Sequence, residues 1–157
     1  MIKVRLQIAN GDILETSDNY GLVYISADSR FHAPIKQREV TTYAEQEGEN
    51  ISSKTVDDAF DYKVTWFVKA NGSLNNANAT IARFNSLLYT QVDDIKTFNE
   101  VSFYNDYKRA KIVGLPLPIS EATEFWRDAQ GKQRDVVCVE WIIRVSKPSL
   151  CDFNLTE

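Results

Sequence analysis

The chain has 157 residues, a formal net charge of −4 and a hydrophobic share of 43%, close to the averages for soluble globular proteins. This composition excludes a collagen, a wholly disordered chain and a disulfide scaffold. No run of residues approaches the roughly 18 apolar residues that a membrane span requires. We therefore expect a single domain over residues 1–157 and no membrane association.

The negative charge is concentrated in one segment of the chain. Residues 41–61 contain six acidic side chains and one lysine, whereas the rest of the chain is close to neutral. The apolar-poor stretch around Glu47, Gly48 and Glu49 predicts a long, exposed, acidic loop over residues 44–58. A nucleic-acid-binding protein gathers positive charge on one face, so we expect no specific nucleic-acid binding here.

Alternation of apolar and polar residues predicts strands through the first half of the chain. The predicted strands cover residues 2–8, 12–16, 22–26, 34–43 and 60–70. Asn10-Gly11 is a strong hairpin turn signal, because both residues tolerate a positive φ. The alternation is clearest in the last of these strands, whose apolar face consists of Phe60, Tyr62, Val64, Trp66 and Val68.

One amphipathic helix is predicted at about residues 76–90. Its apolar face consists of Ala77, Ile81, Phe84 and Leu88, which recur at helical spacing. Ser73 or Asn75 is the candidate N-cap. We expect the helix to end before the sequence Val92-Asp93-Asp94.

The last third of the chain returns to strand patterns. Strands over residues 98–104 and 107–115 flank Asn105-Asp106, which is typical of a two-residue type I′ turn. A second predicted hairpin joins residues 123–127 to residues 134–147. The second arm of that hairpin is apolar on both faces, which indicates a central strand covered on one side by the helix.

These elements define the expected fold class. They predict a β-dominated α+β fold, an antiparallel β-sandwich or split barrel with one packed helix. A short C-terminal tail begins at about residue 148.

Catalytic and metal-binding signals are weak. His32 is the single histidine, and it lies in a loop-like segment without a catalytic partner nearby in the sequence. The spacing of Asp57, Asp58 and Asp61 fits no EF-hand calcium loop, and no bidentate glutamate follows at the required offset. Cys138 and Cys151 are thirteen residues apart and are expected to be free thiols. We therefore expect no catalytic residue, cofactor or metal, although a hydrolase with an unrecognised carboxylate pair stays an alternative.

Aromatic residues near the expected loops and edges allow two interpretations. Tyr107, Phe125 and Trp126 form either a sugar-stacking platform or the anchors of a protein interface, because tyrosine and tryptophan are enriched at both. The basic cluster of Lys108, Arg109 and Lys111 is best interpreted as a charged hairpin that protects a sheet edge.

The order of the elements resembles that of a known family. The relevant stretches are Arg38-Glu39-Val40 leading to Tyr43 and Gly48-Glu49, the strand of residues 60–67, the helix of residues 77–89 and the closing residues 142–148. This order resembles the N-terminal domain of phage distal tail proteins and related baseplate or tail-tube modules. The family often has an Arg-Asp-Gly turn where this chain has Glu47-Gly48-Glu49. Many members also have a second, C-terminal domain, and we expect a shorter tail or baseplate component here, encoded by a prophage.

The resemblance implies a non-enzymatic structural subunit of a phage tail or tail-like assembly. Such a subunit self-associates into a ring or tube and contacts other tail or baseplate proteins. It resides in the bacterial cytoplasm during assembly and then in the virion tail, and the strand-like N-terminus predicts no signal peptide. The alternative is a small carbohydrate- or ligand-binding β-sandwich that uses edge aromatics. The candidate interface residues are Tyr43, Glu47, Gly48, Glu49, Tyr107, Phe125 and Trp126.

Overall fold

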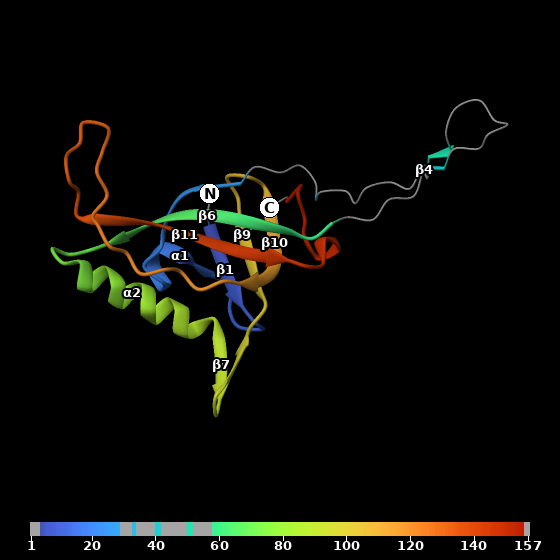
Figure 1. Cartoon of the computed structure of the whole chain (residues 1–157), viewed down its shortest axis with the longest axis horizontal. Helices are drawn as coiled ribbons and strands as arrows, with labels where there is room; N and C mark the ends of the chain where they lie inside the picture. The colour runs from blue at the N-terminus through green and yellow to red at the C-terminus, as the bar shows by residue number, and fades with distance from the viewer. Residues whose placement is uncertain (1–3, 29–32, 34–39, 42–49, 52–57, 156–157) are drawn as a thin grey trace.

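The computed structural model describes residues 4–28, 33, 40–41, 50–51 and 58–155 (Figure 1). Strands dominate these ranges. The strands are β1 (Val4–Ile8), β2 (Leu14–Glu15), β3 (Val23–Ala27), β4 (Val40–Thr41), β5 (Asn50–Ile51), β6 (Phe60–Lys69), β7 (Tyr89–Val92), β8 (Ile95–Phe98), β9 (Val101–Asn105), β10 (Ala110–Pro116) and β11 (Val136–Val145). The helices are α1 (Thr16–Asn19), α2 (Leu74–Leu87) and the 3₁₀-helix η1 (Pro148–Leu150).

Seven of the strands form one sheet in the order β2-β1-β9-β10-β11-β6-β3. Every pairing between neighbours in this sheet is antiparallel. The two outermost strands do not pair with each other, so the described sheet does not close into a barrel. The predicted fold class, a β-dominated α+β sandwich with one main helix, is confirmed.

The sheet bends where β10 passes from one half to the other. Along most of its length β10 pairs with β9, and only Leu115 and Pro116 pair with β11. Gly114 lies at this crossing, where an added Cβ would overlap the carbonyl oxygen of Arg144 on β11. A glycine is therefore needed for the two backbones to approach each other at the bend.

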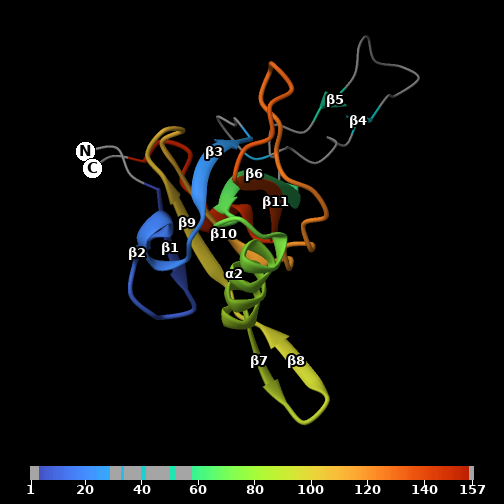
Figure 2. The same ribbon diagram turned by 90° about the vertical axis from the view of Figure 1, so that its left-hand side faces the viewer.

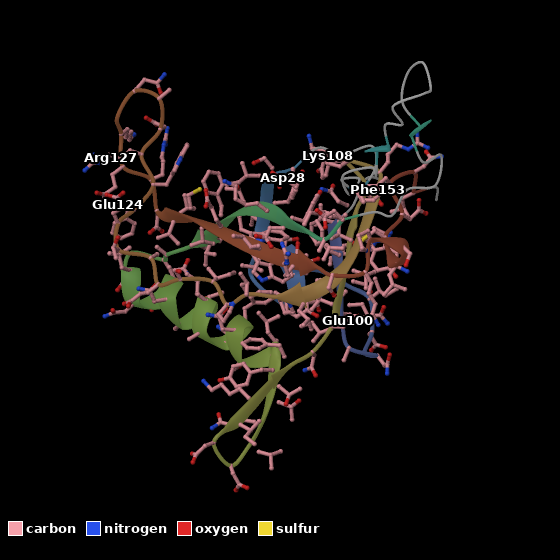
Figure 3. All side chains as sticks on the ribbon, turned by 45° about the vertical axis from the view of Figure 1, so that its right-hand side comes forward. Asp28, Glu100, Lys108, Glu124, Arg127 and Phe153 are labelled. Atoms are coloured by element: carbon pink, nitrogen blue, oxygen red, sulfur yellow. The ribbon has the colours of Figure 1, made fainter. Side chains whose placement is uncertain are left out.

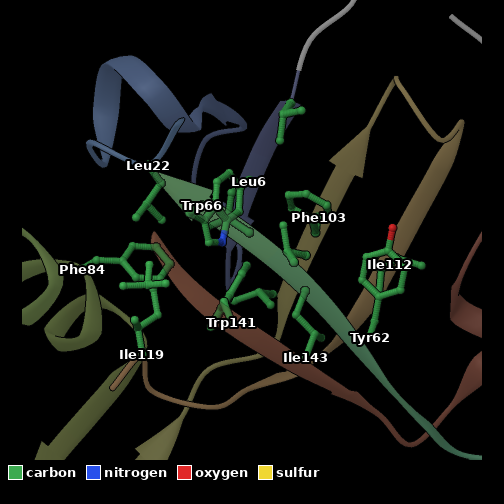
Figure 4. Close-up of a cluster of buried hydrophobic side chains, with 14 of the residues drawn as sticks. Leu6, Leu22, Tyr62, Trp66, Phe84, Phe103, Ile112, Ile119, Trp141 and Ile143 are labelled. Carbon is green, nitrogen blue, oxygen red and sulfur yellow. The ribbon is translucent and has the colours of Figure 1, made fainter. Parts of the chain in front are cut away.

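The two halves of the bent sheet enclose an aromatic core (Figure 4). The ring of Phe103, on β9, lies 5.7 Å from that of Trp66 and 6.3 Å from that of Trp141. These three side chains have no exposed surface. Because Phe103 and the two tryptophans come from different halves, their contacts hold the halves face to face, and burial of such rings is a large hydrophobic contribution.

Helix α2 covers one end of this core. Ser73, one of the two predicted candidates, is the N-cap, and its side chain accepts a hydrogen bond from the Asn75 backbone N–H at 3.2 Å. Ala77, Ile81 and Phe84 are buried, and the ring of Phe84 lies 5.4 Å from that of Trp141. The predicted core face of the helix is therefore confirmed.

Two asparagines of α2 fasten the segment that follows β10. Asn78 exchanges two hydrogen bonds with the backbone of Ala122, at 2.8 and 3.0 Å. Asn85 does the same with the backbone of Ile119, with both distances at 2.9 Å. These side chains replace the strand pairing that the segment lacks, so residues 119–122 are held against the helix.

The prediction that the helix extends to residue 90 is wrong. The helix ends at Leu87, and Tyr89–Val92 is strand β7, which pairs with β8 in a separate two-stranded sheet. The predicted end at Val92-Asp93-Asp94 is instead the turn of this hairpin. The β-branched residues Thr90 and Val92 favour a strand over a helix once the core face has ended.

Other predicted boundaries also differ from the structure. The predicted two-residue turn Asn105-Asp106 is a four-residue turn, because Asn105 pairs with Ala110. The predicted strand of residues 12–16 contains only the two residues of β2 before α1 begins. In the second predicted hairpin, of residues 123–127 and 134–147, the first arm forms no strand and contributes only an isolated bridge between Arg127 and Gln133.

Strand β11 is central, as predicted, but it is not buried on both faces. Val137, Val139, Trp141, Ile143 and Val145 are buried. On the opposite face, Cys138, Glu140 and Arg144 are exposed. Helix α2 packs on the same face as the core, so the apolar run reflects the high strand propensity of its residues rather than two-sided burial.

Two further segments complete the described chain. Strand β5 falls inside the predicted loop of residues 44–58 and pairs with β4 through Val40↔Ile51 and Thr41↔Asn50. The C-terminal tail follows η1 and pairs with β10, because Lys111 and Asp152 exchange backbone hydrogen bonds of 2.7 and 2.9 Å. His32, in the segment predicted as a loop, lies outside the described residues.

Candidate assembly surfaces

The hairpin β7–β8 projects from the body of the molecule, away from the seven-stranded sheet (Figures 1 and 2). Its base is fixed by an edge-to-face contact between the rings of Tyr89 and Phe98, whose centroids are 5.8 Å apart, and by a 2.8 Å hydrogen bond that the Asn99 backbone N–H donates to the Leu88 carbonyl oxygen. Asp93, in its turn, has a φ of 54°, a left-handed conformation that aspartate tolerates well.

One face of this hairpin consists entirely of exposed β-branched side chains. The register pairs Val92 with Ile95 and Thr90 with Thr97, which places these four residues on the same face. Val92 is 67% exposed and Ile95 is 70% exposed. Isolated two-stranded hairpins are only marginally stable in water, so a projecting hairpin with an uncovered apolar end is typical of an interaction element.

The turn between β9 and β10, residues 106–109, is a second exposed surface and carries basic and aromatic side chains. Lys108 and Arg109 are exposed, and Tyr107 is 58% exposed. The ring of Tyr107 stacks on that of Tyr24, with centroids 5.1 Å apart and planes inclined by 11°. Burial raises the pKa of Tyr24 above its ordinary value, and the Asn105 side chain donates a hydrogen bond to its hydroxyl at 3.3 Å.

A cationic layer continues from this turn along the outer face of the sheet. The Arg5 guanidinium lies 5.2 Å from the centre of the Tyr104 ring, and the Lys111 ammonium lies 5.5 Å from it. Asp106 neutralises Arg5 across 3.5 Å. The basic side chains in and next to this turn are Lys108, Arg109 and Lys111, and the Arg109 side chain also donates a 3.4 Å hydrogen bond to the Leu155 carbonyl oxygen.

Phe125 and Trp126 lie elsewhere on the molecule. Trp126 contacts the outward-facing side of β6, where its ring meets that of Phe67 at 4.9 Å, and Phe125 packs against the core. In Figure 3 the neighbouring labels Glu124 and Arg127 are well separated from Lys108, which adjoins Tyr107. The two neighbouring rings therefore have different surroundings, Phe125 against the core and Trp126 on the outer side of β6, and Tyr107 lies apart from both.

A groove of 490 Å³ lies between the segment after β10 and the outer face of β11. Glu121, Glu124 and Glu140 contribute carboxylates to its lining, and Cys138 contributes a thiol. Glu140 pairs with Lys63 at 3.4 Å. Although Cys138 is largely exposed, partial desolvation against the groove, followed by the nearby charge of Glu140, raises the pKa of its thiol, so it is less ionised than an ordinary cysteine at neutral pH.

The part of the chain that the structure describes has neither a metal-binding cluster nor a membrane-spanning helix. It contains no group of three or more His, Cys, Asp or Glu side chains that could hold a metal ion. Asp58 accepts a hydrogen bond from the Ala59 backbone N–H, and Asp61 pairs with Arg144 at 3.1 Å. Within the same residues, no helix is long and apolar enough to cross a membrane. Both cysteines are free thiols, as predicted.

Four of the predicted interface residues cannot be placed. Tyr43, Glu47, Gly48 and Glu49 lie outside the described residues, as does most of the predicted acidic loop. Sequence reasoning missed the hairpin β7–β8. The available signal was the run of β-branched residues around a two-residue turn, Thr90-Gln-Val92-Asp-Asp-Ile95-Lys-Thr97.

Comparison with known proteins identifies a related fold. No protein-family model matches the sequence. No curated protein matches it significantly. Among solved structures, the fold is similar to the crystal structure of the SPP1 Dit (gp 19.1) protein, described as a paradigm of the hub adsorption apparatus in phages that infect Gram-positive bacteria.

That similarity has a TM-score of 0.56 at 14% sequence identity, and it covers 92% of this chain and 50% of SPP1 Dit. The chain therefore spans about half the length of the phage protein. At this identity the comparison establishes a shared fold, and the fold of nearly the whole chain is that of part of a phage tail hub protein.

Proposed function

We propose that the chain is a non-enzymatic structural subunit of a phage tail or tail-like assembly. It self-associates into a ring or tube and contacts other tail or baseplate proteins, and its final location is the virion tail. The observation that carries this proposal is the fold similarity to a phage tail hub protein over 92% of the chain. The prophage origin belongs to the same proposal.

The surface of the molecule supports an assembly role. Among the large hydrophobic residues that the structure describes, Val92 and Ile95 on the projecting hairpin have the greatest fractional exposure. Repeated contacts between identical subunits close into a ring when the two contacting surfaces differ and the rotation between copies closes. A small domain with two distinct exposed elements at different ends provides two differing surfaces for such a contact (Figure 2).

The carbohydrate-binding alternative has less support from the arrangement of the aromatic side chains. A sugar-stacking platform needs its rings on one surface. Tyr107 stacks on Tyr24, whereas Trp126 packs on Phe67. We therefore favour the interpretation that Tyr107, Phe125 and Trp126 anchor protein contacts.

The predicted acidic loop of residues 44–58 has a role in the proposed tube. If it lines a channel that carries DNA, its charge of −4, from five acids and one lysine, repels the DNA backbone and prevents adhesion. Tyr43, Glu47, Gly48 and Glu49 are then at the lumen or at a subunit contact. A structure of the assembly that places this segment on the outer rim would contradict this role.

The proposal is tested by size-exclusion chromatography with multi-angle light scattering, followed by negative-stain electron microscopy. We expect a concentration-dependent increase in mass and ring-shaped or tubular particles. A strict monomer at every concentration, with no rings in the images, is the result that would count against self-assembly. Binding to a panel of polysaccharides, with no rings, would favour the alternative.

A further inference from the structure

We infer that the hairpin β7–β8 of one copy docks on the β9–β10 turn of the next copy, so that the two elements are the two halves of one head-to-tail interface. This inference rests on the proposed self-association and names the surfaces that carry it.

The first step is that the hairpin needs a cover. Thr90, Val92, Ile95 and Thr97 form an exposed face, while the opposite face is occupied by Tyr89, Phe98 and Lys96. The Lys96 ammonium lies 4.7 Å from the centre of the Tyr89 ring, so the aromatic part of this second face is already covered from within the hairpin. Only the β-branched face is left to gain from burial, at about 25 cal/mol per Å² of apolar surface.

The second step is the charge at the tip. Asp93 and Asp94 form the turn between Val92 and Ile95, and both carboxylates are exposed. An apolar pair flanked by two negative charges selects a partner surface that is basic and partly aromatic. The 490 Å³ groove does not qualify, because Glu121 and Glu124 would repel the tip.

The third step is the complementary surface on the same molecule. The β9–β10 turn presents Lys108 and Arg109 beside the exposed ring of Tyr107, and Lys111 adds a further positive charge. Tyrosine is enriched at the centre of protein interfaces, where it buries a large rigid surface. The positive charge of this turn and its exposed tyrosine ring are the properties that complement the hairpin tip.

The fourth step is geometry. The hairpin and the β9–β10 turn lie at opposite ends of the molecule in two perpendicular views (Figures 1 and 2), and Lys108 lies at the end away from the hairpin in Figure 3. The hairpin of one copy therefore cannot reach its own basic turn. It meets the turn of another copy, and this heterologous contact is the type that propagates into a ring or an open filament.

Charge exchange between two separate variants tests the inference. Asp94→Lys alters the tip without changing Asp93, which holds the positive φ, and Lys108→Glu alters the acceptor without changing Arg109, whose φ is 53°. Each variant alone is expected to raise the apparent dissociation constant for self-association about tenfold, measured by sedimentation velocity. An equimolar mixture is expected to restore association, because each reversed tip then meets a reversed turn.

A second variant tests the apolar contact independently of charge. Val92→Thr with Ile95→Thr keeps β-branched residues in the hairpin and removes apolar surface from its face. It is expected to weaken self-association by a similar factor, whereas Ile13→Thr, at a site 44% exposed outside the hairpin, is the matched control and is expected to leave it unchanged. Asp12→Lys and Lys132→Glu are the matched controls for charge.

The possible outcomes distinguish failure of the proposed interface from failure of the proposed self-assembly. Wild-type self-association that survives both charge variants would overturn the inference and leave the proposed function standing. Weakening by both variants without restoration on mixing would show that the two surfaces do not meet, and would also overturn the inference. A wild-type chain that stays monomeric at all concentrations would overturn the inference together with the proposed self-assembly.

Discussion

Replacement of Gly114 by alanine is expected to destabilise the fold at the bend of the sheet. The new Cβ would overlap the Arg144 carbonyl oxygen and lie 2.9 Å from both the Arg144 carbonyl carbon and the Ile143 Cγ2 atom. Backbone atoms of a paired central strand cannot rotate away as a flexible side chain can. Strand β11 must therefore shift, and the pairing of Leu115 with Arg144 is strained.

The magnitude follows from two contributions. Overpacking costs about 1–3 kcal/mol, and the loss of a backbone hydrogen bond at the crossing adds about 1 kcal/mol. We therefore expect Gly114→Ala to lower the free energy of unfolding by about 3 kcal/mol. For a chain of this size that corresponds to a fall in Tm of about 6–12 °C.

Urea denaturation followed by tryptophan fluorescence measures this change. Gly131→Ala is the control, because Gly131 has a φ of 80° but no atom within 4 Å of an added Cβ. That control should cost only backbone strain, about 1 kcal/mol. If Gly114→Ala costs no more than Gly131→Ala, the interpretation of Gly114 as a point of close backbone approach is refuted.

Three further predictions concern the helix and one turn. Phe84→Ala should lower the free energy of unfolding by about 3–5 kcal/mol, since it empties a fully buried site; thermal unfolding checks this, and a loss below 1 kcal/mol would contradict the packing described. Asn78→Ala should lower the free energy of unfolding by about 1–3 kcal/mol, because it leaves the backbone of Ala122 without its two hydrogen bonds. Urea denaturation measures this loss, and hydrogen exchange at the Ala122 amide should become faster. Unchanged exchange would contradict the role of Asn78 in holding this segment. The Lys132 backbone N–H donates a hydrogen bond to the Asp128 carboxylate and holds its pKa below the ordinary value. The stabilisation of this turn is therefore present above the unfolded-state pKa and is lost as pH falls through the lower folded-state pKa. NMR titration of the Asp128 carboxyl should show the lowered pKa, and an ordinary pKa would contradict this prediction.

The local pattern was sufficient to predict the elements whose apolar faces meet the core. The alternation of Phe60 to Lys69 and the helical spacing of Ala77, Ile81 and Phe84 both predicted the buried faces correctly. In these segments, propensity and burial favour the same structure, so short-range periodicity carries the information.

The hairpin β7–β8 was missed because its neighbourhood gives a mixed pattern. Leu88 continues the apolar stripe of α2 and is fully buried, which extends the apparent helix toward residue 90. The strand signal lies in the β-branched residues on either side of Asp93-Asp94. A hairpin without a core-facing side has no burial periodicity. Its β-branched and acidic residues could be identified in the sequence, but their pairing into a hairpin could not be predicted from periodicity.

Long-range features were beyond the reach of the sequence. The bend at Gly114 depends on the approach of Arg144, thirty residues later, and a single glycine in a strand does not reveal its neighbour. Tyr107 was a candidate interface residue from the sequence, but its stacking on Tyr24 and its distance from Trp126 follow from the tertiary arrangement. The sequence therefore predicted which types of residue form the candidate surfaces, but not where those residues lie in the fold.

Native mass spectrometry of the wild-type chain over a range of concentrations tests the central claim most directly. The account predicts an oligomer whose share rises with concentration. It has a fixed number of copies where the head-to-tail contact closes into a ring, and a range of lengths where copies continue into a tube or filament. It also predicts loss of that oligomer in the Asp94→Lys variant. A monomer at every concentration would contradict the claim that this fold serves here as a self-assembling subunit.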